Sequence, residues 1–164
     1  MTEQIITKEL LDELFEYKNG SLYWKIKISK KIIIGNKAGS VNGNGYWRVR
    51  LNKKLYYAHR LIFSIHHGYI PKYIDHIDGN KLNNKIENLR EVTLIQNGQN
   101  SKLGKANTSG IKNVSWSKVK DKWLVHIRIN RKKKNLGYYA DIELAELIAI
   151  EAREKYHGAF ANHG

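Results

Sequence analysis

Four polar residues between positions 75 and 97 are of the types that phosphodiester hydrolysis requires. Asp75 is followed directly by His76, and Asn88 and Asn97 come later in the chain. A neutral imidazole can accept a proton from water near neutral pH. A bound cation can relieve charge on a phosphate, and carboxylate and amide oxygens can hold such a cation. These residues would therefore suit metal-assisted hydrolysis of a phosphodiester.

The segment around these residues is predicted to form a hairpin followed by a helix. Asp75 and His76 are adjacent on a predicted strand, where neighbouring side chains point to opposite faces. They can serve one site only if the strand twists or ends there. Residues 78–80 (DGN) are typical of a turn, residues 89–92 predict the second strand, and Thr93 can cap the helix. Polar groups that face inward from the hairpin and the helix could hold one divalent cation.

This segment resembles the ββα-metal motif of HNH endonucleases, in the HNN branch found in phage homing and nicking enzymes. The resemblance is carried by Asp75-His76, Asn88 and Asn97. It implies that Asp75 and Asn97 bind the cation, with Mg²⁺ expected ahead of Mn²⁺ and Zn²⁺. It also implies that His76 is the general base, while Asn88 holds the loop and orients His76. The implied activity is metal-dependent cleavage of double-stranded DNA.

The C-terminal part of the chain combines basic and aromatic residues with a strand pattern. Residues 122–129 alternate between a polar, basic set and an apolar set that could pack on a helix predicted at 142–157. A basic face of a small sheet can enter the DNA major groove. The run 131–134 (RKKK) is either a solvated turn or a set of phosphate contacts, and the neighbouring strands favour phosphate contacts.

Residues 110–164 also resemble the Apetala-type (ethylene-response-factor) DNA-binding domain, which is often fused to phage HNH enzymes. Matching segments include 107–110 (NTSG), 114–116 (VSW), 126–128 (HIR) and 136–139 (LGYY). Two arginines of that family's first strand appear here as serines, so its base specificity is not expected to carry over. The resemblance implies these DNA contacts: Trp116, Lys118, Lys122, His126, Arg128, Lys133 and Asn135.

Several other polar residues have both a functional and a structural interpretation. His59 and Arg60 precede the motif and could lie at the DNA cleft, with Arg60 on a phosphate, or they could cap and solvate a helix start. His66 and His67, at the end of that helix, are expected to be surface residues that match the helix dipole. Asp78 is expected to be a turn former. Asn84 could bond loop backbone or phosphate, and loop bonding is favoured.

Composition limits the classes of protein and partner. The chain has 164 residues, a formal net charge of +14 and a pI near 9.8, which indicates a polyanionic partner. It has no cysteine, which excludes disulfides and Cys-ligated zinc. No apolar run approaches the roughly 20 residues of a membrane span. We expect a cytoplasmic protein, in the bacterial host if phage-encoded, that binds DNA and no membrane.

The expected fold class is α+β. We expect an HNH domain at 1–100 with N-terminal strands and helices and its ββα-metal motif at about 73–100. A linker at 101–109 would lead to a DNA-binding domain at 110–164, a three-stranded antiparallel sheet packed on one helix. Predicted N-terminal helices are 7–17 and 58–67, and predicted strands are 21–28, 46–51 and 55–57.

One other function fits the same residues. A DNA-binding regulator with a decayed nuclease site would keep the charge pattern, although the intact motif argues against it. A single HNH centre cuts one strand, so nicking by a monomer or weak dimer is the expected activity.

Overall fold

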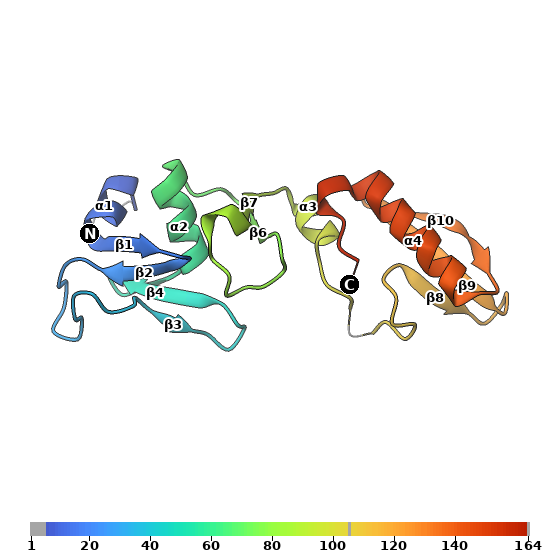
Figure 1. The fold of residues 1–164 in the computed structure, drawn as a ribbon, viewed down its shortest axis with the longest axis horizontal. Coiled ribbons are helices and arrows are strands. Elements are labelled where there is room, and N and C mark those ends of the chain that lie inside the picture. The colour runs from blue at the N-terminus through green and yellow to red at the C-terminus, as the bar shows by residue number, and fades with distance from the viewer. Residues whose placement is uncertain (1–5, 105, 164) are drawn as a thin grey trace. The chain divides into compact units, whose positions relative to one another are not determined.

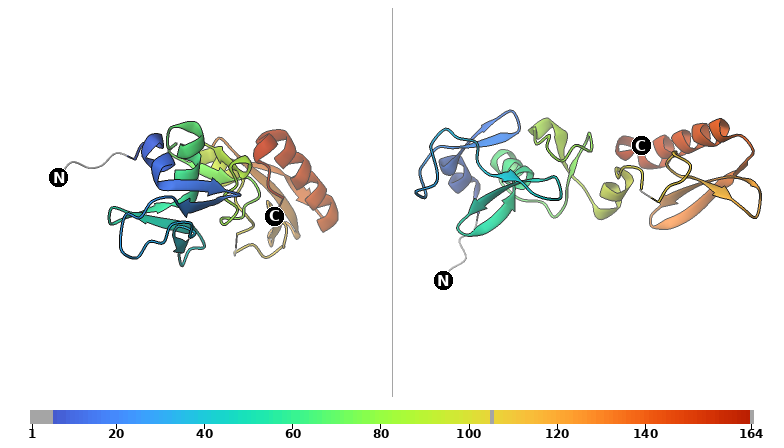
Figure 2. Two further views of the ribbon diagram at one scale, coloured as in Figure 1. Left: turned by 60° about the vertical axis from the view of Figure 1, so that its left-hand side comes forward. Right: turned by 90° about the horizontal axis from the view of Figure 1, so that it is seen from below.

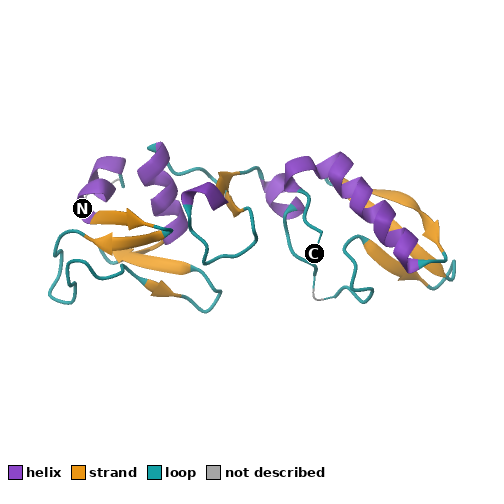
Figure 3. Cartoon of the chain, in the orientation of Figure 1, coloured by secondary structure: helices purple, strands orange, loops and turns teal. Residues whose placement is uncertain are grey.

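The structure is a computed structural model that describes residues 6–104 and 106–163. The chain divides into two compact units, Met1–Glu91 (unit 1) and Val92–Gly164 (unit 2). Both units mix helices with small antiparallel sheets, so the expected α+β class is confirmed (Figure 3). No helix among the described residues is both long and apolar enough to span a bilayer.

Unit 1 packs two helices against two small sheets (Figure 1). Its core contains Leu11, Leu22, Val49 and Leu61, each at most 1% exposed. The elements of unit 1 are α1 (Lys8–Leu14), β1 (Phe15–Lys18), β2 (Ser21–Trp24), β3 (Ser40–Val41), β4 (Trp47–Leu51), β5 (Lys54–Tyr57), α2 (Ala58–His67), β6 (Ile74–His76), the 3₁₀ helix η1 (Ile86–Asn88) and β7 (Leu89–Glu91).

The first predicted helix, 7–17, is too long. Helix α1 ends at Leu14, and Phe15 begins β1, which pairs with β2. Asn19 and Gly20 have positive φ angles of 45° and 79°, which suit a tight hairpin turn. This turn folds residues 15–18 back as a strand and buries Phe15 against Trp24, with ring centroids 4.7 Å apart. Local helical periodicity therefore gives way to hairpin pairing.

Unit 2 places one long helix on a three-stranded sheet, as predicted (Figure 2). The antiparallel sheet has the order β10-β9-β8, and Val125 and Ala145 are fully buried between sheet and helix. Its elements are α3 (Leu94–Gln99), β8 (Val114–Ser117), β9 (Lys122–Ile129), β10 (Lys132–Tyr139), α4 (Ile142–His157) and the 3₁₀ helix η2 (Gly158–Phe160).

Helix α3 belongs to the same compact unit as the C-terminal sheet. Lys112 Nζ donates to the carbonyl oxygen of Gln99 at 3.0 Å, and Asn162 Nδ2 donates to that of Asn100 at 3.0 Å. The segment predicted as a ββα-metal motif therefore has its hairpin in unit 1 and its helix in unit 2. The functional domain limits at residues 100 and 110 stay predictions.

Candidate active site

The β6–β7 hairpin carries the adjacent Asp75 and His76. The strands pair antiparallel, with Asp75 opposite Arg90 and His76 opposite Leu89. Strand β6 ends at His76, and the chain turns there, since Gly79 N donates to the His76 carbonyl at 2.9 Å. Asp75 is 8% exposed and His76 is 6% exposed. Asp75 and His76 can serve one site only if the strand twists or ends at them, and strand β6 does end at His76.

The His76 imidazole is held by an asparagine of the following loop. His76 Nε2 lies 2.8 Å from Asn84 Oδ1, in a contact that is buried. Because an amide oxygen only accepts hydrogen bonds, Nε2 must carry the proton. In the neutral ring the lone pair then resides on Nδ1. Asn84, itself 3% exposed, thus selects the tautomer of His76.

Asp75 forms an ion pair with the residue opposite it on β7. Arg90 Nε and Nη2 donate to Asp75 Oδ2 at 3.0 Å and 2.9 Å. Only 10% of the Asp75 side chain and 17% of the Arg90 side chain are exposed. The guanidinium therefore balances a largely buried carboxylate and fixes its orientation on the strand.

Asn88 fastens the loop that joins the two strands. Its Oδ1 accepts from Asp78 N at 3.1 Å, and its Nδ2 donates to Asp78 Oδ1 at 2.9 Å and to the Asn83 carbonyl at 2.7 Å. The expected loop-holding contacts of Asn88 are thus present. The side chain that bonds the His76 ring is Asn84, a residue expected to bond loop backbone or phosphate.

Asp78 lies in the turn, where it acts as an acceptor. It receives hydrogen bonds from Asn80 N at 2.8 Å and from Asn83 Nδ2 at 2.6 Å, in addition to that from Asn88. Burial alone would raise the pKa of Asp78, but these hydrogen bonds outweigh it and the pKa is lowered. The expected turn-forming role is therefore confirmed.

An aromatic cluster surrounds the second histidine of the site. The ring of His59, at the start of α2, meets the His76 ring edge to face at 5.1 Å and stacks on Tyr57 at 5.5 Å. Tyr46 lies 5.7 Å from His59, measured between ring centroids. Burial lowers the pKa of His59 to about 3, with help from the charges of His76 and Arg60. His59 is thus neutral near pH 7 and is not a solvated helix cap.

The remaining residues of α2 serve the packing of unit 1. Arg60 donates to the carbonyl oxygens of Pro71 at 2.8 Å and Lys72 at 3.3 Å, which ties α2 to the segment before β6. His66 and His67 are exposed in the last turn of α2, as expected. A contact of His59 or Arg60 with DNA stays a prediction.

Asn97 lies on α3, in unit 2, and its side chain is exposed. Thr93 caps this helix as predicted, since its Oγ1 accepts from Gln96 N at 3.3 Å while Gln96 Oε1 accepts from Thr93 N at 2.8 Å. The sharing of a cation by Asp75 and Asn97 stays a prediction.

The donor set suits an oxygen-ligated cation. Within residues 6–104 and 106–163, no group of three or more His, Cys, Asp or Glu could hold a metal. Mg²⁺ does not need such a group, because it keeps several waters and often takes one or two protein oxygens plus substrate phosphate oxygens. The buried carboxylate of Asp75 can supply one such oxygen, and the amide of Asn97 is of the right type for another.

Most predicted DNA contacts of unit 2 are accessible. Trp116 is 43% exposed and meets Trp123 edge to face, with ring centroids 4.9 Å apart. His126 is partly buried, and Asn135 Oδ1 accepts from Gly137 N at 2.9 Å, which supports a bulge between β9 and β10. The other predicted contacts are exposed: Lys118, Lys122, Arg128 and Lys133.

Sequence reasoning missed Arg90 and assigned Asn84 too minor a role. Arg90 was visible as a basic residue on the second predicted strand, but its pairing with Asp75 depends on the register of the hairpin. The Asn84 contact depends on how the loop folds back over eight residues. Neither the Arg90–Asp75 pair nor the Asn84–His76 contact can be predicted from local periodicity.

Comparison with known proteins assigns the segment that carries the candidate active site to a family. Residues 56–99 match the HNH endonuclease family. The chain is similar to Protein 3.8 of Escherichia phage T7, at 39% identity over 107 residues, covering 63% of this chain and 86% of that protein. It is also similar to an uncharacterized HNH endonuclease of Acanthamoeba polyphaga mimivirus, at 37% identity over 106 residues, covering 63% of this chain and 54% of that protein. No solved structure matches the chain.

With the Asp75-His76 pair buried on a short hairpin inside the matched segment, the chain belongs to the HNH endonuclease family and is a nuclease.

Proposed function

We propose that this nuclease hydrolyses phosphodiester bonds of double-stranded DNA with His76 as general base and with one divalent cation. The observation that carries the proposal is the bond between His76 Nε2 and Asn84 Oδ1, beside the ion-paired Asp75. It gives a buried imidazole one defined tautomer next to a carboxylate. A general base needs that kind of fixed geometry.

The proton of the attacking water passes to Nδ1 of His76, because Nε2 already carries a hydrogen that it donates to Asn84. Imidazolium formation leaves that hydrogen bond intact, so the ring need not reorient during the step. Asn88 maintains the turn at Asp78 and thereby the loop on which Asn84 is placed. His76 and Asn88 are the proposed catalytic pair.

Asp75 and Asn97 would hold the cation, with Mg²⁺ expected first and Mn²⁺ as the alternative. When bound, the cation supplies charge relief for the scissile phosphate and the leaving 3′ oxygen. Arg90 orients the Asp75 carboxylate, because it donates twice to Oδ2.

Residues 110–164 would bind DNA in the manner of the Apetala-type domain that they resemble. The exposed cations of β9 and β10 provide phosphate attraction, and Trp116 offers an exposed ring. The high positive charge of the chain supports a polyanionic substrate. One centre per chain favours nicking by a monomer or weak dimer. The similarity to a phage protein supports a phage-encoded enzyme that acts in the host cytoplasm, and we expect it to be of the homing type.

A plasmid-relaxation assay with Mg²⁺ tests the proposal. Conversion of supercoiled to open-circular DNA by the wild type should fall at least 100-fold in His76→Ala, since loss of a general base costs about 10²–10⁴-fold. The matched control is His67→Ala, an exposed histidine of α2 that should cut normally. Equal cutting by His76→Ala and wild type, or cutting unaffected by EDTA, would contradict the proposal.

A further inference from the structure

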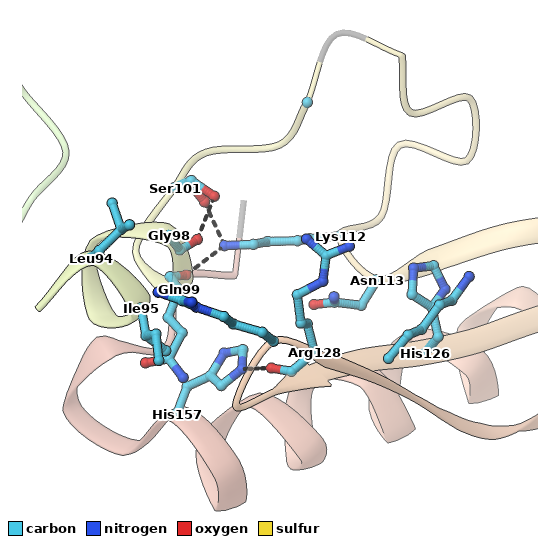
Figure 4. Close-up of a pocket in the computed structure, with 13 residues that line it drawn as sticks. Leu94, Ile95, Gly98, Gln99, Ser101, Lys112, Asn113, His126, Arg128 and His157 are labelled. Atoms are coloured by element: carbon cyan, nitrogen blue, oxygen red, sulfur yellow. Dashed lines mark hydrogen bonds between the residues drawn. The ribbon is translucent and has the colours of Figure 1, made fainter.

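Unit 2 contains a pocket of about 710 Å³ (Figure 4). One of its walls is the apolar side of α3, where Leu94 is 53% exposed and Ile95 is 37% exposed. Among the described residues that line it there is no Asp or Glu. Six basic residues line it together with uncharged ones: Lys112, His126, Arg128, Arg131, Lys133 and His157.

Two imidazole nitrogens at this pocket have unmet hydrogen-bonding capacity. Nδ1 of His126 and Nδ1 of His157 are buried and have no hydrogen-bond partner within the described part of the chain. The other nitrogen of His157, Nε2, lies 3.1 Å from the carbonyl oxygen of Arg128, so that ring is fixed in place. A buried polar atom without a partner is destabilising. Because the carbonyl oxygen of Arg128 accepts from Nε2 of His157, Nδ1 of that ring can donate to an anion only when the ring is protonated.

The electrostatics of the pocket favour an anion. Burial lowers the pKa of His126, and the neighbouring charges of Lys133 and Arg128 lower it further. Burial likewise lowers the pKa of Lys112 to about 8, with a smaller effect from Arg153. Burial is the largest cause of both shifts, and it disfavours the charged forms of these groups. An anion in the pocket would stabilise the charged forms of these groups.

We infer that this pocket binds one phosphate group of the DNA backbone together with its attached sugar, an inference that rests on DNA being the substrate of the proposed function. Cationic side chains on one wall match the phosphate, and the apolar wall formed by Leu94 and Ile95 matches the deoxyribose. Its volume lies in the range of pockets that enclose a small organic ligand, about 300–1,000 Å³. The predicted contacts His126, Arg128 and Lys133 thus line a hollow that α3 helps to form.

A substitution that fills the pocket without changing charge gives the sharpest test. Gly98 lies on α3 among the lining residues, and a Cβ added there would meet nothing within 4 Å. Gly98→Leu should therefore place a side chain in the pocket, whereas Gly98→Ala should leave most of it open. Binding is measured by fluorescence anisotropy with a 30-base-pair duplex in EDTA and in the His76→Ala background, so that no DNA is cut. We expect Gly98→Leu to weaken binding at least tenfold and Gly98→Ala less than threefold.

A second pair of variants tests the charges. Arg128→Gln with Lys133→Gln removes two pocket cations, and the matched control Lys120→Gln with Lys155→Gln removes two exposed lysines that do not line the pocket. Both double variants have the same net charge, so a general loss of attraction affects them equally. We expect the pocket variant to lose at least tenfold more affinity than the control at about 100 mM salt. Circular dichroism verifies that all variants are folded.

Three results would overturn the inference. The first is equal loss of affinity in the pocket and control variants, and the second is unchanged affinity in Gly98→Leu. The third combines two observations. Inorganic phosphate binds and shifts the NMR signals of the His126 and His157 rings, but DNA affinity is the same in the wild type, in Gly98→Leu and in the Arg128→Gln/Lys133→Gln variant. Because all binding is measured without cleavage, a failure of the proposed chemistry at His76 would leave these outcomes unaffected.

Discussion

The β6–β7 hairpin and the β8–β10 sheet both carry polar side chains that we propose act on DNA, but they hold them in opposite ways. In the hairpin, Asp75, His76 and Asn88 are each at most 8% exposed and are bonded to neighbouring protein groups. On the sheet, Lys122 and Arg128 are exposed to solvent. Proton transfer requires atoms fixed to within about 0.5 Å. Attraction to phosphates is long-ranged and tolerates mobile charges.

This contrast predicts where substitutions are costly. Removing a partner inside the hairpin leaves a buried polar group unsatisfied. The result is either a less stable fold or misplaced side chains at the candidate active site. Removing one cation from the sheet subtracts a solvated charge, which has a small and graded effect. The four predictions below test this difference, from the largest expected effect to the smallest.

Arg90→Met should have the largest effect, because it leaves the Asp75 carboxylate buried without its guanidinium. Loss of one partner of a buried pair costs about 3–5 kcal/mol. Urea denaturation should show that loss in the free energy of unfolding. The control is Lys18→Gln, which breaks an ion pair with Glu16 whose side chains are 59% and 51% exposed, and it should cost less than about 1 kcal/mol. Similar losses in both variants would contradict the contrast.

His59 should make unit 1 sensitive to acid. The pKa of His59 is about 3 in the folded protein against 6.5 for the ordinary group, so between those values the unfolded chain takes up a proton that the folded chain does not. Stability is therefore lost as the pH falls below 6.5. The wild type should lose about 2–3 kcal/mol more than His59→Phe between pH 7 and pH 4.5 in urea denaturation. Parallel pH profiles for the two proteins would refute this origin of acid sensitivity.

Asn84→Ala should lower cleavage by about 10- to 100-fold, the usual effect of removing a group that orients a reactive side chain. In the proposed mechanism Asn84 is a positioning residue, because its contact with His76 Nε2 makes Nδ1 the basic nitrogen of the neutral ring. DNA binding in EDTA should stay unchanged, so the loss should appear in the turnover rate. The control is Asn83→Ala, which removes a neighbouring amide that bonds Asp78 instead. A defect confined to binding would contradict the positioning role.

Lys122→Gln should have the smallest effect, since Lys122 is an exposed cation at the start of β9. Affinity for duplex DNA should fall about two- to threefold at 100 mM salt, equally for unrelated sequences. The slope of log affinity against log salt should decrease by about one. A loss confined to one sequence would instead assign Lys122 to base recognition.

Elements with strong local end signals could be predicted to the residue. Helix α2 (58–67) was predicted correctly, and Gly68, with φ 81°, terminates it. Helix α4 (142–157) was predicted from its apolar periodicity, and the structure shows Asp141 capping its first turn. Strand β9 was also correct, with Val125 and Ile127 buried as its alternation predicts. Where pairing competes with local preference, as in residues 15–18, prediction from periodicity was wrong.

The site shows the same difference between features set by local sequence and features set by tertiary contacts. The residues proposed for catalysis and metal binding could be selected from their types and spacing, because that information is contained in one segment, and their roles stay predictions. Their partners could not, since Arg90 depends on strand register and Asn84 depends on the path of a loop. The deep burial of His59 was also unforeseen, because it follows from three aromatic neighbours that come from separate elements.

The turn between β9 and β10 has a consequence for engineering. Arg131 adopts φ 67° at this turn, a left-handed conformation that costs an ordinary residue roughly 1 kcal/mol and costs glycine almost nothing. Glycine at this position would give a more heat-resistant hairpin, yet it would delete a cation from the rim of the pocket. A screen that selects for thermostability without measuring DNA binding would therefore enrich variants with lower affinity for DNA.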